Sequence, residues 1–208
     1  MAPVPQRKFI AIAGNIGAGK TELTEFLCHR YGLKPFYEPN DRNPYLADFY
    51  ADMRTWAYRS QLFFLTHKFS LHLALQDEPG AVIQDRTIYE DAEIFARNLR
   101  RRRLIDKRDF DTYWELYQSI RRALRPPDLM IQLRCPVRTL RQRIRTRGRP
   151  FEQAMPADYL RRLNRLYEDW FVRYQLSPVL VLETHKLDYL TDLVDRVDLF
   201  RRIERYLG

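Results

Sequence analysis

The chain has 208 residues, 45% of them hydrophobic and 30% charged, which is an ordinary composition for a globular protein with one sizeable core. No apolar run approaches the length of a membrane span, and the first residues lack the apolar stretch of a signal peptide. The net charge of +9 suits a polyanionic partner, either a nucleic acid or the phosphate chain of a nucleotide. The two cysteines, Cys28 and Cys135, show no metal or redox spacing, so we expect free thiols in a reducing cytoplasm.

Short apolar runs alternate with helical patterns along the chain. Strands are predicted over residues 7–14, 34–39, 80–85, 126–133 and 177–183. Helices are predicted over residues 20–31, 45–77, 137–147, 158–174 and 187–206, with further helices between 86 and 125. Apolar strands that alternate with helices are typical of a parallel sheet covered on both faces. We see no repeat and no linker, and therefore predict an α/β fold with a five-stranded parallel sheet, in a single domain spanning 1–208.

The first predicted strand leads into a glycine-rich loop, GNIGAGKT, at residues 14–21. This loop fits the pattern G-x-x-x-x-G-K-[ST] and lies where that pattern should, after a strand and at the start of a helix. Backbone N–H groups of such a loop point at phosphate oxygens, and the helix N-terminus adds partial positive charge. The lysine contacts the terminal phosphates and the threonine hydroxyl binds Mg²⁺. We therefore expect ATP, or another nucleoside triphosphate, to be held by Gly14, Asn15, Ile16, Gly17, Ala18, Gly19, Lys20 and Thr21.

Motors, switches, ligases and small-molecule kinases all use this loop, so the destination of the γ-phosphate must be found elsewhere in the chain. A kinase needs a base for the acceptor hydroxyl and positive charge around the moving phosphoryl group. Glu38 follows the second strand, and Asp85 and Arg86 follow the third, at the edge where open α/β sheets bind ligands. Asp85 is a candidate Mg²⁺ ligand through water, and Arg86 is a candidate partner for phosphate or for Glu38. The alternatives are an exposed loop carboxylate and a structural ion pair.

An arginine cluster, RQRIRTRGRPFE, occupies residues 141–152. Arg143 and Arg147 are four residues apart on one predicted helix face, and Arg149 follows Gly148. A glycine beside arginines at a helix end indicates a hinged lid, over about 143–153, that closes cations over phosphates and excludes water. A solvated basic face or a nucleic-acid patch is the alternative interpretation of the same charges.

Together these motifs resemble the deoxynucleoside kinase family, which includes deoxycytidine, deoxyguanosine and bacterial deoxyadenosine kinases. The resemblance runs from the phosphate loop to the helix after RGRPFE. Glu38-Pro39 matches a Glu-Pro after the second strand, and Asp85-Arg86-Thr87 matches an Asp/Glu-Arg-Ser motif with threonine in place of serine. The stretch NPYLADFYADMRTWAYRSQLFFL is most similar to the bacterial deoxyadenosine and deoxyguanosine kinases.

The resemblance implies a P-loop kinase fold, a three-layer α/β sandwich with a helical, arginine-rich lid, and it implies roles for individual residues. Glu38 would be the general base for the sugar 5′-hydroxyl. The other catalytic residues would be Arg86, Lys20, Arg143 and Arg147, and the substrate-binding set would be Glu38, Tyr50, Trp56, Gln61, Lys68, Arg86, Asp91 and Glu152. Arg143, Arg147 and Arg149 would contact the donor phosphates, and Thr21 and Asp85 would hold Mg²⁺.

The predicted function is phosphorylation of a deoxynucleoside. A kinase of another small alcohol and a non-enzymatic P-loop protein that binds nucleic acid are the alternatives. Gln61 and Asp91 both favour a base with an amino group beside a ring acceptor, and Lys68 can donate to a purine N7. The expected order is therefore deoxyadenosine, deoxycytidine, deoxyguanosine and thymidine, with a deoxyguanosine-preferring kinase as the alternative. A homodimer is implied by the resemblance, and no nucleic-acid or membrane partner is expected.

Overall fold

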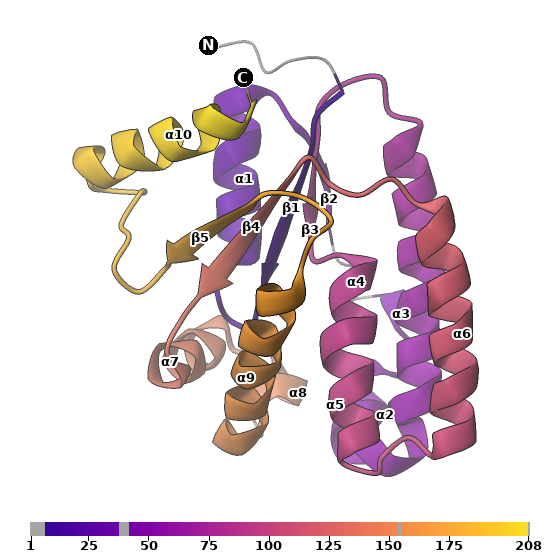
Figure 1. Cartoon of the computed structure of the whole chain (residues 1–208). Helices are drawn as coiled ribbons and strands as arrows, with labels where there is room; N and C mark the ends of the chain where they lie inside the picture. Colours follow the sequence, from indigo (N-terminus) through magenta and orange to yellow (C-terminus); the bar gives the residue numbers. More distant parts are fainter. Residues whose placement is uncertain (1–6, 38–41, 154, 208) are drawn as a thin grey trace.

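The computed structural model describes residues 7–37, 42–153 and 155–207, and its elements are arranged around one parallel sheet (Figure 1). The strand order is β2-β3-β1-β4-β5. The strands are β1 Phe9–Gly14, β2 Lys34–Phe36, β3 Val82–Asp85, β4 Leu129–Arg134 and β5 Val179–Glu183. The prediction of a five-stranded parallel sheet is therefore confirmed, and each predicted strand overlaps an observed one.

Helices cover the sheet and extend beyond it. They are α1 Lys20–Tyr31, α2 Leu46–Ala51, α3 Met53–Gln76, α4 Ile88–Glu90, α5 Arg97–Arg101, α6 Lys107–Ala123, α7 Val137–Arg147, α8 Pro150–Gln153, α9 Ala157–Arg173 and α10 Leu193–Leu207, with a π-helical turn, η2 Asp91–Ala96, between α4 and α5. Figure 1 shows α3, α6 and the α4–η2–α5 segment side by side as a bundle next to the sheet. Within the described ranges, no helix is both long and apolar enough to cross a bilayer.

The central strand β1 positions the glycine-rich loop. All six of its residues are buried, because β3 flanks it on one side and β4 on the other. The register places Ile12 opposite Asp85 and Gly14 opposite Leu133. The loop therefore leaves the sheet from the middle of its carboxyl edge, next to the end of β3. Crossovers run in opposite directions from such a central strand, and ligands of open α/β sheets bind at that point.

Two helices differ from the sequence prediction, and in both cases an aspartate explains the difference. The stretch predicted as mostly helical over 45–77 is divided at Asp52, which has non-helical backbone angles (φ −141°, ψ 86°) and whose carboxylate accepts hydrogen bonds from the N–H groups of Arg54 and Thr55. The closing helix begins at Leu193 rather than at residue 187. There Asp192 accepts the N–H of Asp195 and caps the first turn.

Candidate active site

The glycine-rich loop has a backbone that only glycine accommodates easily. Gly17 and Gly19 have φ values of 79° and 94°, in the left-handed region. A Cβ on Gly17 would also lie 3.0 Å from the carbonyl oxygen of Leu140. Lys20 begins α1, and its ammonium donates to the carbonyl of Asn15 at 3.2 Å. The loop therefore curves back on itself in front of a helix N-terminus, which is the arrangement that binds a phosphate chain.

Helix α9 holds the start of this loop. The buried side-chain amide of Asn15 donates to the carbonyl of Leu160 at 3.0 Å and to the side-chain oxygen of Asn164 at 2.6 Å. The Asn15 side-chain oxygen accepts the N–H of Ile16 at 2.8 Å. These contacts orient the loop before any ligand binds.

Thr21 and Asp85 form an oxygen-rich pair beside the loop. The Thr21 hydroxyl donates to Oδ2 of Asp85 at 2.6 Å. Oδ1 of Asp85 is buried and accepts no hydrogen bond from the part of the chain that the structure describes. Hydroxyl and carboxylate oxygens are the protein ligands that Mg²⁺ uses together with phosphate oxygens and water. The pair that the sequence analysis named for Mg²⁺ therefore fits that ion chemically.

Arg86 is held in an unusual conformation next to the same loop. Its φ is 62°, which is uncommon for a residue with a side chain. The side chain is almost fully buried, with Nη2 3.4 Å from the carbonyl oxygen of Gly14 and Cζ 4.5 Å from the ring centre of Phe95. A buried guanidinium fixed in this way supplies positive charge at the carboxyl edge of the sheet.

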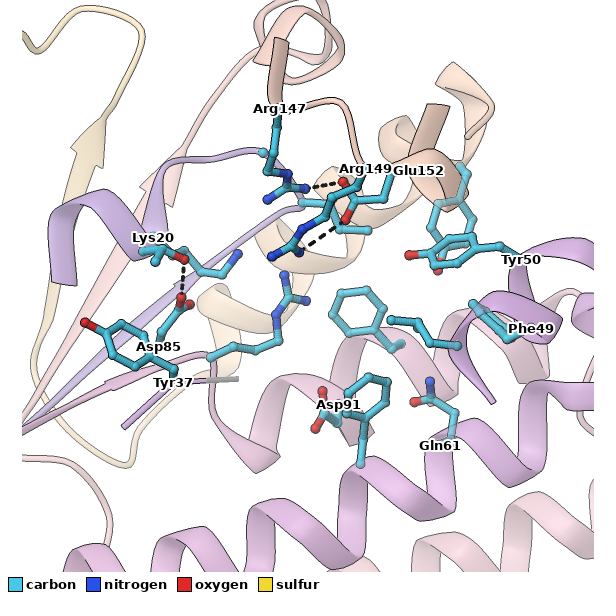
Figure 2. A pocket seen from close by; sticks show the side chains of 18 of the residues that line it. Lys20, Tyr37, Phe49, Tyr50, Gln61, Asp85, Asp91, Arg147, Arg149 and Glu152 are labelled. Atoms are coloured by element: carbon cyan, nitrogen blue, oxygen red, sulfur yellow. Dashed lines mark hydrogen bonds and ion pairs between the residues drawn. The ribbon is translucent and has the colours of Figure 1, made fainter. Parts of the chain in front are cut away.

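A cavity of about 290 Å³ opens among these residues. Figure 2 shows Gln61 and Asp91 on the wall opposite Arg147 and Arg149, with Lys20 to one side. Gln61 is 4% exposed, and its side-chain oxygen accepts no hydrogen bond from the described residues. Because buried amides normally have hydrogen-bond partners, this oxygen is suited to a donor group on a ligand. The cavity thus has a cationic wall and a wall that can form hydrogen bonds with a nucleobase.

Lys68 lies behind this second wall rather than on it. Its side chain is completely buried, and the ammonium lies 2.9 Å and 2.8 Å from the two carboxylate oxygens of Asp91. Asp91 lines the cavity, whereas the lining does not include Lys68. Burial, and then the negative charge of Asp91, raise the pKa of the nearby Tyr113 phenol well above its ordinary value. The structure therefore gives Lys68 a position from which it orients Asp91.

Two aromatic residues of the predicted substrate set differ in position. Tyr50 at the end of α2 lines the cavity, as the resemblance implied. Trp56 does not belong to the lining and stacks instead on Tyr45, with ring centres 5.7 Å apart and planes inclined by 25°. The guanidinium of Arg59 covers the Trp56 ring at 5.3 Å. Trp56 thus supports the α2–α3 junction from outside the cavity.

The arginine cluster divides into two groups. Arg147 and Arg149 both pair with Glu152, which is 5% exposed, and the second pair has an N–O distance of 3.7 Å (Figure 2). Arg143 instead donates to the carbonyls of Ala18 at 3.1 Å and Thr184 at 2.9 Å. Arg143 therefore braces the glycine-rich loop, while the other two arginines face the cavity.

A second cavity, of about 610 Å³, adjoins the first. Its lining includes Thr139 and Arg143 from α7 and Glu22 from α1. The residues that line both cavities are Gly17, Lys20, Thr21, Glu25, Arg147 and Arg149. A phosphate chain in the second cavity would therefore meet a ligand in the first at Lys20 and Thr21. This junction is the geometry that transfer of a phosphoryl group requires.

The comparisons with known proteins agree with this geometry. A family model described as deoxynucleoside kinase matches residues 10–207. The chain belongs to the deoxynucleoside kinase family. A deoxyguanosine kinase of Lactobacillus acidophilus is 38% identical over 197 residues, which cover 90% of this chain and 85% of the relative. A deoxyadenosine/deoxycytidine kinase of Bacillus subtilis is 34% identical over 193 residues, covering 91% and 88%.

The fold comparison supports the same assignment. A solved structure of deoxyadenosine kinase from M. mycoides with bound dCTP superposes with a TM-score of 0.81 at 28% identity, covering 95% of this chain and 98% of that one. The predicted family and the predicted P-loop kinase fold are thus confirmed, and this deoxynucleoside kinase is an enzyme that phosphorylates nucleosides.

Glu38, the implied general base, lies outside the described residues. Other residues line the first cavity although the sequence did not single them out, and Tyr37, which precedes Glu38, is one of them. Phe95 and Tyr159 line the same cavity and were missed. Helical periodicity cannot distinguish a cavity wall from a core. The available signal was the position of Phe95, four residues after Asp91 and so one helical turn further along.

Proposed function

We propose that this kinase transfers the γ-phosphoryl group of ATP, or of another nucleoside triphosphate, to the 5′-hydroxyl of a deoxyribonucleoside. The observation that carries the proposal is the junction of two cavities at Lys20 and Thr21. The larger cavity takes the donor phosphates, because Gly19 and Arg143 line it in addition to the loop residues that border both cavities. The smaller takes the nucleoside, because Gln61 and Asp91 line its far wall. In-line transfer needs the two ligands to meet at such a point.

The cations around the junction stabilise the charge that develops on the moving phosphoryl group. Lys20, Arg147 and Arg149 border both cavities, and Arg86 lines the nucleoside side. Positive groups fixed in place before the reaction need no reorganisation when the charge develops. Arg143 contributes through its bond to the carbonyl of Ala18, which fixes the loop, and through its place in the donor cavity.

Two further groups complete the chemistry. Glu38 would accept the proton of the 5′-hydroxyl as a general base, the role that the resemblance to the family implies. Thr21 and Asp85 would hold Mg²⁺, which neutralises donor phosphate oxygens when bound. Tyr50 and Glu152 would hold the 3′-hydroxyl of the sugar, since both line the nucleoside cavity. Tyr50 would also crowd a ribose 2′-hydroxyl, so deoxyribose is preferred.

For the base we propose deoxyadenosine first and deoxycytidine second. Adenine and cytosine both present an amino donor beside a ring acceptor, which matches the oxygen and the NH₂ group of Gln61. Asp91 is an acceptor when ionised, and the buried ammonium of Lys68 stabilises that form. Thymine would place a carbonyl oxygen there, and a buried mismatch of this kind costs about 1–3 kcal/mol. Through its pair with Asp91, Lys68 acts indirectly on the base.

A deoxyguanosine-preferring kinase is the second candidate, and the names of the relatives favour it as much as the first. Initial rates with MgATP and each of deoxyadenosine, deoxycytidine, deoxyguanosine and thymidine distinguish the two. We expect deoxyadenosine to react fastest and thymidine slowest. Fastest reaction of deoxyguanosine would support the second candidate and overturn the roles given to Gln61 and Asp91. Turnover of none of the four would refute the proposed reaction.

We also propose that the chain forms one domain, works in the cytoplasm and assembles as a homodimer without a nucleic-acid or membrane partner. In support of the dimer, Leu73 on α3 and Leu116 on α6 are 40% and 43% exposed, on helices that lie side by side in Figure 1. Exposed leucines on adjacent helices suit a contact with a second copy. Light scattering coupled to size exclusion, on the unmodified chain and on Leu73→Glu, tests this: only the unmodified chain should have a dimer mass.

A further inference from the structure

Glu90 is a buried carboxylate that the reaction described above does not use. It is the last residue of α4 and is 0% exposed. Its Oε2 accepts the N–H of Thr87 at 2.8 Å and so completes a capping box at the start of this helix. Its Oε1 faces away from that cap and accepts the N–H of Gly14 at 3.1 Å. One carboxylate thus joins the segment after β3 to the first residue of the glycine-rich loop.

Tyr167 on α9 is the second member of the same network. Its hydroxyl oxygen lies 2.9 Å from the carbonyl oxygen of Gly14 and 2.8 Å from Oε1 of Glu90. A phenol has one proton, so this proton is shared between the two acceptors. Nη2 of Arg86 approaches the same Gly14 carbonyl at 3.4 Å. Side chains from two distant segments therefore fix both the N–H and the carbonyl of Gly14.

Gly14 needs such partners because of its place in the sheet. Pairing of β1 with β3 extends to Ile12 and Asp85, after which the chain turns away at Arg86. On the side of β4, pairing continues as far as Gly14 itself. On the β3 side, the carboxylate of Glu90 takes the place that a further strand residue would have had. A buried backbone N–H without a partner would be costly, so this bond fixes the direction in which the chain leaves the sheet.

We propose that Glu90 and Tyr167 are positioning residues for phosphoryl transfer: they fix the peptide of Gly14 and so aim the N–H groups of the glycine-rich loop at the donor phosphates. The inference rests on the proposed donor role of that loop. The contact between Glu90 and Gly14 also links the donor loop to the wall of the nucleoside cavity. The segment from Asp85 to Asp91 carries the Mg²⁺ candidate, Arg86 and a residue of the nucleoside wall. Through Glu90, the same seven-residue segment sets the distance between the donor loop and that wall.

The consequence separates donor binding from nucleoside binding. The hydrogen bonds of Glu90 and Tyr167 described above act on Gly14 of the donor loop and on the first turn of α4, whereas Gln61 belongs to the wall of the nucleoside cavity. Loss of the Tyr167 hydroxyl should therefore weaken MgATP binding and lower kcat, while affinity for the deoxynucleoside stays as it was. Loss of a hydrogen bond to a charged group corresponds to roughly a tenfold or larger effect, and we expect about tenfold in the affinity for MgATP.

The test compares Tyr167→Phe with Tyr174→Phe. Tyr174 follows the last residue of the same helix, and its hydroxyl bonds to the Ser177 hydroxyl at 2.9 Å rather than to Gly14. Both variants remove one partly or fully buried phenol hydroxyl, so both should lower Tm modestly. Titration calorimetry gives the affinities for MgATP and for deoxyadenosine separately, and steady-state kinetics gives kcat and both KM values. Only Tyr167→Phe should lose MgATP affinity and kcat.

Two outcomes would overturn the inference. Equal loss of Tm in the two variants with unchanged MgATP affinity would make the network a purely structural one. Equal weakening of both ligands by Tyr167→Phe would show that the network does not act on the donor loop selectively. Should Tyr167→Phe be too unstable to assay, Glu90→Gln supplies the same comparison, since its amide cannot accept on both sides. An unmodified chain that binds MgATP but phosphorylates no nucleoside would refute the proposed reaction and leave this inference to be judged on the MgATP affinities alone.

Discussion

The buried ion pair between Lys68 and Asp91 allows a prediction whose size follows from the structure. The two side chains are 0% and 4% exposed, and the ammonium lies within 3 Å of both carboxylate oxygens. Replacement of Lys68 by methionine keeps an unbranched side chain that is one atom shorter and removes the charge. Asp91 would then be a buried carboxylate without its cation, which is much costlier than an uncharged pair in the same place.

The expected magnitude is large for one substitution. Breaking a buried pair by removing one partner costs about 3–5 kcal/mol of unfolding free energy. For a chain of this size, each kcal/mol lowers Tm by about 2–4 °C, so Lys68→Met should lower Tm by about 6–20 °C. The double variant Lys68→Met/Asp91→Leu removes both charges and should regain most of that loss, because two apolar side chains can share the space.

Urea unfolding of the single and double variants measures these free energies directly. Lys107→Met is the matched control: it breaks a pair with Asp111 in which both side chains are mostly exposed, so stability should change little. A loss below about 1 kcal/mol in Lys68→Met would contradict the buried pair, since an unpaired buried charge costs more than that. A double variant whose loss of unfolding free energy equals the sum of the two single-variant losses would also contradict the buried pair.

Three further outcomes are expected. Glu38→Gln should lower kcat by about 10²–10⁴ with nearly unchanged nucleoside affinity, and a near-normal kcat would remove Glu38 as the base. Arg149→Ala should depress kcat more than nucleoside binding, as measured by single-turnover kinetics, because cations aimed at the transition state act mainly on turnover. Burial lowers the pKa of His72 below its ordinary value of 6.5. The unfolded chain therefore binds a proton more readily, and stability that is complete above pH 6.5 should fall as the pH decreases below it, by up to about 1.4 kcal/mol per unit. Urea unfolding at pH 7.5 and 5.5 should show this slope, and His72→Gln should flatten it.

The parts of the site that were predictable are those encoded in contiguous residues. The loop at 14–21 specifies its own conformation, because Gly17 and Gly19 occupy left-handed positions and Lys20 starts the helix. The alternation of apolar runs and helices was enough to predict the sheet. The break at Asp52 was not predicted. An aspartate can cap a helix, but helical periodicity continues on both sides of Asp52, so the pattern did not reveal where α2 ends and α3 begins.

Other parts depend on which residues face each other across the fold, and no local pattern contains that information. The spacing of Gln61 and Lys68 places both on one side of α3, yet only Gln61 reaches the cavity, because Asp91 occupies the space in front of Lys68. The pattern Thr87-x-x-Glu90 is a recognisable capping box. Oε1 of Glu90 accepts the N–H of Gly14, which lies 76 residues earlier in the chain. That contact follows only from the packing of β1 against β3 and α4.

The contacts of Asn15 have a consequence for how the chain reaches its native state. The loop that begins at Gly14 is among the first parts to be synthesised, but its partners Leu160 and Asn164 lie 145 and 149 residues later. At roughly 5–20 residues per second on a ribosome, about 7–30 seconds pass before α9 exists. Contacts of such separation also slow folding itself, since the entropy of closing long loops must be overcome first. The nucleotide site is therefore completed late, and an unfinished chain cannot yet assemble a binding site for ATP.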